Sequence, residues 1–355
     1  HSLVVATHGR GIYVLDNVTP LEEQTPAILA SNFHLFPSLP AYMLSFRAKR
    51  TPSLSSFTTP NPPTGVMVDY YVKTAVQPTA AQKRRHQQPV KITITDAAGH
   101  VVDTMFGPAH AGFNRADWPM RYQGATPLNF LKPRARSGYF AFRSLGPAVV
   151  PGTYKITATL GGDSQTVTAN VDPNPNFPVN MANFKAATRA ALEARDDLSA
   201  LDAMLNHLTE LHTQLASVTK MLQPSEPTGM VLAEYQPVLA SAESLDKKVV
   251  AMEAQVYNSK VQPGSEDGLH YLADFRDQLR TIMYSLTPGY DLPPNQQALA
   301  LLQKDTLALH RYLAGFNGLV RTDVAAFNRL ALHHHASTLF AGAAVELPNR
   351  GSGME

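Results

Sequence analysis

The pattern of hydrophobic and polar positions changes once along the chain. Up to about residue 171, apolar residues come in short runs that alternate with polar ones, as in half-buried strands. Beyond residue 178 they recur every three or four positions, as on one face of a helix. Between the two patterns, residues 172–178 read Asp-Pro-Asn-Pro-Asn-Phe-Pro, a cluster that interrupts regular structure. The sequence therefore predicts a mixed, multidomain α+β chain in which an all-β body precedes an all-α body.

The β-rich part, residues 28–175, is predicted to form an Ig-like antiparallel β-sandwich. Its strand-like runs are short and are separated by Pro, Gly and Asn, which is typical of that fold. In the clearest run, Ile156, Ala158 and Leu160 share one face of a strand. The predicted strands are 32–36, 41–46, 66–72, 90–95, 101–106, 113–122, 138–143, 153–160 and 165–171.

The α-rich part, residues 176–336, carries four apolar stripes with helical spacing. They cover 198–222, 238–256, 272–286 and 299–327, and loops that contain Pro or Gly join them. Such a pattern predicts an antiparallel four-helix bundle. Residues 337–355 lie beyond the last stripe and are predicted to be a C-terminal tail.

The first 27 residues form a separate segment. Two β-rich runs, 3–6 and 12–15, flank the sequence Thr-His-Gly-Arg-Gly, which predicts a hairpin followed by a connector. A two-stranded hairpin alone is barely stable in water. We therefore expect this hairpin to have a further sheet as a partner.

The amino-acid composition excludes several kinds of functional site. The chain has 355 residues, 44% of them hydrophobic, and no cysteine, which excludes disulfides, thiolate catalysis and zinc–sulfur sites. No apolar run has the roughly 18 to 20 residues of a membrane span. The net charge is +2, but residues 1–175 carry about +7 and residues 176–355 about −5. The basic residues are scattered, apart from the run Lys83-Arg84-Arg85, which argues against a nucleic-acid partner.

Several short motifs, in this order, resemble the C-terminal region of bacterial exported β-propeller proteins with sialidase-type (BNR) or sortilin-like repeats, often labelled glycosyl hydrolases. Residues 6–16, Ala-Thr-His-Gly-Arg-Gly-Ile-Tyr-Val-Leu-Asp, are similar to the closing propeller strands of that family. Residues 112–118, 151–154 and 264–269 are similar to its tail. The resemblance covers about residues 3–330 and implies that residues 1–27 are closing propeller strands and a connector. The chain begins with His1, without an initiator Met, a basic segment or a cleavage signature, so we expect that its natural N-terminus is missing or was removed. The Asp-box of sialidase blades is absent, so no catalytic residue is carried over.

Four residues are possible ligand or interface residues. His8 and Arg10 lie in the predicted hairpin turn and could stand at a propeller rim. Trp118, the only tryptophan, could stack on a sugar, although a buried core tryptophan is the alternative. Of the adjacent Tyr70 and Tyr71, strand alternation predicts that one ring packs inward and the other outward.

The remaining polar clusters are interpreted as structural. The run at 333–335 holds three histidines, but adjacent positions on a helix point in different directions, so a solvated helix end is favoured over a metal site. Acidic residues at 266, 267, 274 and 277 are interpreted as helix caps rather than as an acid/base pair. The sequence predicts no catalytic site, no cofactor and no metal.

These observations favour a non-catalytic accessory or interaction module of a secreted β-propeller protein, extracellular or periplasmic, which supports the propeller and mediates protein or glycan contacts. The expected partners are the missing N-terminal propeller portion and, in addition, another copy or an envelope protein. The alternative is the C-terminal part of a glycoside hydrolase, or another hydrolase, whose active site lies on the missing propeller. A third hypothesis is a carbohydrate-binding sandwich that uses Trp118 and exposed tyrosines.

Overall fold

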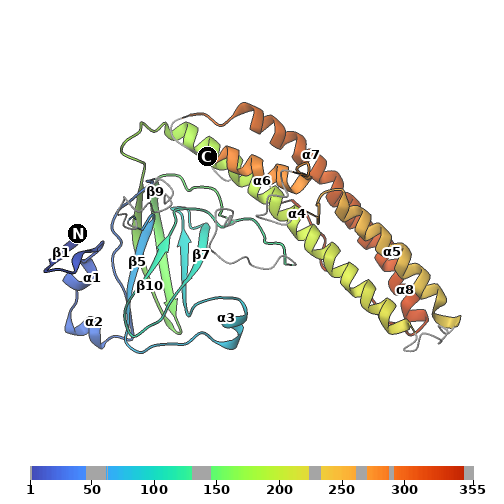
Figure 1. Cartoon of the computed structure of the whole chain (residues 1–355), viewed down its shortest axis with the longest axis horizontal. Helices are drawn as coiled ribbons and strands as arrows, with labels where there is room; N and C mark the ends of the chain where they lie inside the picture. The colour runs from blue at the N-terminus through green and yellow to red at the C-terminus, as the bar shows by residue number, and fades with distance from the viewer. Residues whose placement is uncertain are drawn as a thin grey trace. The chain divides into compact units, whose positions relative to one another are not determined.

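A computed structural model describes residues 2–44, 61, 63–129, 145–223, 233–260, 270–287 and 292–347. The chain is mixed α+β, as predicted, and divides into two compact units (Figure 1). The β unit contains residues 1–123, 148–185 and 289–292. The helical unit contains residues 124–147, 186–288 and 293–355.

The β unit contains three sheets among its described residues. Five strands lie in the order β4-β10-β9-β6-β7, and three lie in the order β3-β5-β8. All neighbours are antiparallel except β4 and β10. The third sheet is the hairpin of β1 and β2. The bounds are β1 Leu3–Thr7, β2 Gly11–Leu15, β3 Phe33–Leu35, β4 Ala41–Tyr42, β5 Val66–Val72, β6 Val90–Thr95, β7 Val101–Gly107, β8 Gly112–Trp118, β9 Gly152–Leu160 and β10 Asp163–Asp172.

The five-stranded and three-stranded sheets share one hydrophobic core. Alternation along β5 turns Val66, Val68 and Tyr70 inward, and the same rule turns Ile156 and Ala158 inward on β9. Three short helices lie outside this core: α1 (Thr19–Glu22), α2 (Pro26–Ala30) and α3 (Ala80–Arg84).

A side-chain amide links the edges of the two sheets. Gln165 on β10 accepts a hydrogen bond from the Leu35 backbone N–H (2.9 Å) and donates one to the Phe33 carbonyl (3.0 Å). The amide therefore binds β3 with the donor and acceptor pair that a neighbouring strand would offer.

Predicted and observed strands agree closely where both can be compared. The predicted run 66–72 coincides with β5 and 90–95 with β6, whereas 113–122 is longer than β8, which ends at Trp118. The predicted strand 138–143 and the motif 264–269 lie outside the described residues.

A glycine makes the packing of Tyr70 possible. A Cβ atom on Gly107, at the end of β7, would overlap the Tyr70 hydroxyl, which donates a hydrogen bond to the Pro108 carbonyl (2.6 Å). We expect Gly107→Ala to lower the free energy of unfolding by about 1 to 3 kcal/mol, because the buried ring must shift. Urea unfolding measures this loss. Gly152→Ala, where the added carbon meets no close neighbour, should leave stability nearly unchanged.

The helical unit is built on two long helices. Helix α4 (Met181–Leu222) has 42 residues. Helix α7 (Gln296–Leu319) continues through a π-helical turn (Val320–Val324) into α8 (Ala325–His333), since the junction residues keep helical dihedral angles. Between them along the chain come a 3₁₀ turn (Ala233–Tyr235), α5 (Gln236–Ala254) and α6 (Phe275–Leu286).

Helices α5 and α6 pack on different parts of the long α7–α8 helix. Contacts join α6 to α7 and α5 to α8 (Figure 1). The main core holds Leu205, Val249, Leu279 and Leu309. Ile282 belongs to a second apolar cluster, which includes Ala190, Ala191 and Ala194 of α4 and Ala298 and Leu302 of α7. The apolar residues of the described helices thus form two clusters, and α6 contributes to both.

The strand-to-helix change occurs between the end of β10 at Asp172 and the start of α4 at Met181, around the predicted boundary at 176.

Two segments without helix or strand also belong to the helical unit. Residues 124–129 bury Ala125 and Leu128 in its main core, although they were predicted to be part of the sandwich. Residues 337–347 bury Leu339 and Val345 there, so this half of the predicted tail is packed.

Candidate interaction site

The hairpin of β1 and β2 is the most unusual surface in the described part of the β unit. Five residues of each strand pair in register, from Leu3 with Leu15 to Thr7 with Gly11. The turn needs a left-handed backbone at Gly9 and Gly11, which have φ angles of 80° and 96°. Sequence and local structure agree on this hairpin, and it pairs with no other described strand.

Both faces of this hairpin are apolar and exposed. Strand alternation places Leu3, Val5, Tyr13 and Leu15 on one face and Val4, Ala6, Ile12 and Val14 on the other. Ile12 is 71% exposed, Val4 62% and Tyr13 58%. A sheet with one face in water alternates apolar and polar residues, whereas continuous apolar runs are typical of strands buried on both faces. Both faces of the hairpin are therefore apolar, as in a pair of strands that is buried on both sides.

A buried polar cluster fixes the chain directly after the hairpin to the three-stranded sheet. The Asn17 side chain donates to Asp69 on β5 (2.7 Å) and accepts from the Thr19 backbone N–H (3.0 Å). Asp69 also receives two hydrogen bonds from Arg115 on β8 (2.6 and 3.0 Å). Asn17, Thr19 and Asp69 are all buried. The connector is thus held firmly next to a hairpin whose own side chains are exposed.

We expect Asn17→Ala to detach this connector. The substitution removes two buried hydrogen bonds and should cost about 1 to 3 kcal/mol of local stability. Limited proteolysis should then cut residues 16–25 faster, while the thermal transition of the sheets changes little. Asn176→Ala, which removes an exposed amide, is the matched control. Equal cleavage rates in the two variants would contradict the anchoring role.

The structure separates the four predicted ligand or interface residues into two pairs. His8 and Arg10 lie in the exposed hairpin turn. Trp118 and Tyr70 are fully buried, so neither side chain is open to a ligand in the described structure, and Trp118 fits the core alternative. Trp118 donates to the Arg121 carbonyl (3.0 Å) and packs edge-on against Tyr154. Burial raises the pKa of Tyr70, which keeps its hydroxyl a hydrogen-bond donor.

Strand alternation explains the positions of Tyr70 and its neighbour. Tyr70 points into the core and Tyr71 points outward, where it packs against Phe113, which is exposed. A role of Trp118 in glycan binding, as in the third hypothesis, is not supported because the indole has no exposed face.

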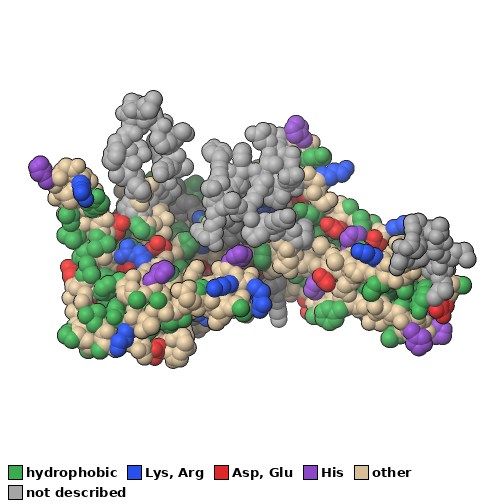
Figure 2. Space-filling view, turned by 60° about the horizontal axis from the view of Figure 1, so that its bottom comes forward, with side chains coloured by type: hydrophobic (Ala, Val, Ile, Leu, Met, Phe, Trp, Pro, Cys, Tyr) green, Lys and Arg blue, Asp and Glu red, His purple; other side chains and the backbone are tan. Residues whose placement is uncertain are grey.

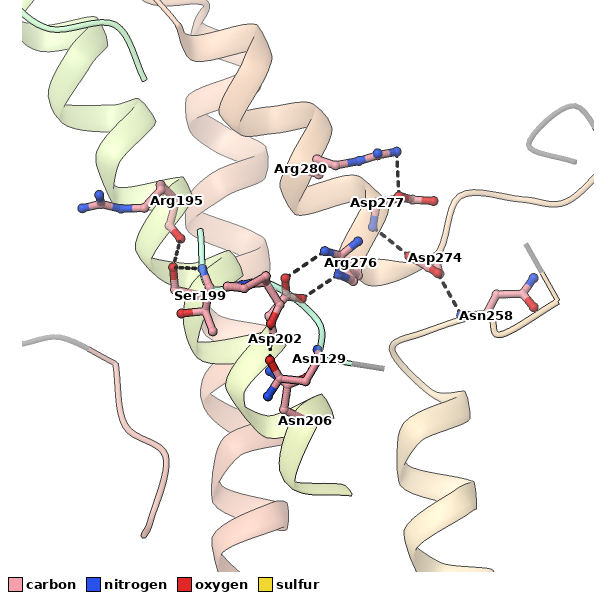
Figure 3. Close-up of polar contacts among 12 residues, drawn as sticks. Asn129, Arg195, Ser199, Asp202, Asn206, Asn258, Asp274, Arg276, Asp277 and Arg280 are labelled. Carbon is pink, nitrogen blue, oxygen red and sulfur yellow. Dashed lines mark hydrogen bonds and ion pairs between the residues drawn. The ribbon is translucent and has the colours of Figure 1, made fainter. Parts of the chain in front are cut away.

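The helical unit holds a network of charged side chains (Figure 3). Arg276 on α6 makes two hydrogen bonds to Asp202 on α4, at 2.6 and 2.8 Å, and both side chains are largely buried. Burial raises the pKa of Asp202, and Arg276 opposes this effect. Because the two charges satisfy each other, this pair is suited to fixing α6 against α4.

Of the neighbouring acids, Asp274 is the N-cap of α6 and Asp277 lies in its first turn, which agrees with the structural interpretation of these two residues. Asp274 accepts from the Asp277 backbone N–H (2.7 Å) at the start of α6 and from the Asn258 backbone N–H (2.8 Å). Asp277 pairs with Arg280 one turn along the helix (Figure 3). Residues 266 and 267 lie outside the described residues.

The remaining candidate residues, the possible metal ligands and the basic side chains, do not gather at one site in the described part of the chain. Within the described ranges, no group of three or more His, Asp or Glu side chains lies close enough to hold a metal ion. The histidine run stands where α8 ends. Lys and Arg side chains form separate small groups on the face shown in Figure 2. No helix in the described part of the chain is long and apolar enough to cross a membrane.

Comparisons with protein-family models, with curated proteins and with solved structures gave no match. The resemblance to the propeller family therefore rests on the short motifs alone. Of these motifs, 6–16 spans the hairpin turn and β2, 112–118 is β8, and 151–154 enters β9.

Proposed function

We propose that this chain is a non-catalytic interaction module of a secreted β-propeller protein, and that its N-terminal hairpin completes a propeller blade. In this proposal, the two facing sheets are an Ig-like sandwich and the helices are an antiparallel bundle. The observation that carries the proposal is the exposure of both apolar faces of β1 and β2.

The chemistry of the hairpin favours a β-sheet as the partner. The outer edges of β1 and β2 offer backbone donors and acceptors that a further strand can pair with. Burying a large apolar side chain fully gains about 1.5 to 3 kcal/mol. Leu3, Val4, Ile12, Tyr13 and Val14 together would provide a substantial driving force for such pairing.

A propeller accounts for the second apolar face. Its blades are four-stranded sheets arranged around a central channel, so a blade packs against a neighbour on each side. A hairpin that supplies two strands of such a blade needs apolar residues on both faces, as β1 and β2 have. Residues 6–16 resemble closing propeller strands, and an extracellular or periplasmic location follows from the same resemblance.

Mixing experiments test this function. The proposal requires a propeller chain as the partner. That chain should be expressed separately and mixed with this one, and complex formation should be measured by native mass spectrometry. We expect a one-to-one complex that Ile12→Lys with Val14→Lys abolishes. Leu307→Lys, at an exposed leucine of α7, should leave binding unchanged. Absence of a complex, or equal loss in both variants, would contradict the proposal.

The alternative, a hydrolase whose active site lies on the propeller, gives a different expectation for the complex. Under that alternative, the complex turns over a glycan or peptide substrate and this chain alone does not. Activity screens on glycan and peptide panels of the complex and of each chain separate the two functions. Turnover by this chain alone would contradict both.

A further inference from the structure

The C-terminal strap, defined here as residues 336–347, occupies a groove of the helical unit. It leaves α8, reverses direction and runs back along the long helices. Leu339 lies opposite Asn328 of α8, Phe340 opposite Gln214 of α4, and Val345 opposite Asn317 of α7. The groove is thus formed by α4 on one side and the α7–α8 helix on the other.

Three side-chain amides hold the strap by its backbone. Asn328 donates to the Leu339 carbonyl (2.9 Å) and accepts from its N–H (2.7 Å). Gln214 makes the same pair with Phe340 (2.9 and 2.8 Å), and Asn317 makes it with Val345 (2.8 and 3.0 Å). Each amide offers one donor and one acceptor, as a neighbouring strand would. The groove therefore binds the strap through the backbone of three of its residues.

Two buried side chains of the strap also hold it in the groove, and one glycine of the strap lies close to a histidine ring of α4. Leu339 and Val345 are buried in the main core, whereas Phe340 is 77% exposed. Gly342 has a φ angle of 72° and lies against the His207 ring, where an added Cβ would stand 3.0 Å from Cε1. The groove thus selects a segment with two aliphatic residues and a glycine between them.

The hinge between α8 and the strap is strained. His335 has a φ angle of 52°, a left-handed conformation that favours glycine. It ends α8 as the reversing residue of a Schellman turn, in which the Ala336 N–H donates to the Ala331 carbonyl (2.8 Å). A short, strained hinge favours exchange of a terminal segment between two copies, because extending the hinge relieves the strain.

We propose that this groove is an exchange site between two copies of the chain, in which the strap of one copy fills the groove of the other. The contacts are the same in either arrangement, since each strap meets an identical groove. Only the hinge differs, and it loses its left-handed residue on exchange. This proposal concerns a different surface from the hairpin and stands independently of the propeller partner.

These 355 residues contain no cysteine, so introduced cysteines allow a direct test with the whole chain. Glu210 bonds to the Gln214 side chain and so marks the groove, while Phe340 marks the strap. Chains with Glu210→Cys are mixed with chains carrying Phe340→Cys, and a short bis-maleimide reagent is added. We expect covalent dimers whose yield rises with chain concentration. Leu307→Cys replaces Glu210→Cys in the control mixture and should give few dimers.

Hinge variants make the test specific. His335→Gly removes the strain and should lower the exchanged fraction about tenfold, since left-handed strain of this size corresponds to about a factor of ten in the equilibrium constant. His335→Pro forbids the left-handed turn and should raise the fraction. The double variant Glu210→Cys with Phe340→Cys must cross-link within one chain. Dimer yields equal to the control, yields insensitive to both hinge variants, or no internal cross-link would each overturn the proposal.

Discussion

Arg276→Ala should destabilise the helical unit by about 3 to 5 kcal/mol. The substitution leaves Asp202 buried, with the two hydrogen bonds from the guanidinium removed. An unpaired buried charge is among the most costly changes in a protein. Helix α6 should lose its attachment to α4 at this point, and chemical denaturation followed by circular dichroism at 222 nm measures the loss.

Two further variants isolate the cause. Arg280→Ala, on the same helix, removes a more exposed arginine that pairs with Asp277, and should cost less than about 1 kcal/mol. The double variant Asp202→Leu with Arg276→Met removes both charges and should recover much of the stability. If Arg276→Ala and Arg280→Ala behave alike, the buried pair does not have the role assigned to it.

Trp118→Ala should destabilise the β unit by about 3 to 5 kcal/mol, because it leaves a large cavity in the shared core and removes the packing partner of Tyr154. Differential scanning calorimetry should show a lower transition temperature for this unit. Phe113→Ala, on the same strand but exposed, is the matched control and should shift the transition little. A folded Trp118→Ala variant of wild-type stability would contradict the core assignment.

Much of the fold could be predicted because the hydrophobic period reports burial directly. The run 66–72 predicted β5 correctly, and the stripe at 299–327 predicted the long α7–α8 helix. The start of α4 was missed: its first turns pack through small alanines such as Ala187, Ala191 and Ala194, which give a weak apolar stripe. A π-helical turn inside a continuous helix also has no signal in the apolar period.

Candidate contacts were harder to predict, because they depend on tertiary burial. Single residues such as Trp118 and Tyr70 look the same in sequence whether they line a surface or a core. Asn206, Asn317 and Asn328 gave no signal, since a side-chain amide that binds a distant backbone has no fixed spacing. The hairpin did carry a signal: its continuous apolar runs at 3–6 and 12–15 are typical of strands covered on both faces.

The most direct test of the proposed function is amide hydrogen exchange in the hairpin, with and without the propeller partner. In the monomeric chain alone, the amides of Val4, Val5, Tyr13 and Val14 should exchange rapidly, while those of Ile92 and Ile156 are strongly protected. Adding the propeller chain should slow exchange in β1 and β2 to rates close to those of the core strands. Strong protection in the monomer, or no change on adding the propeller, would contradict the account.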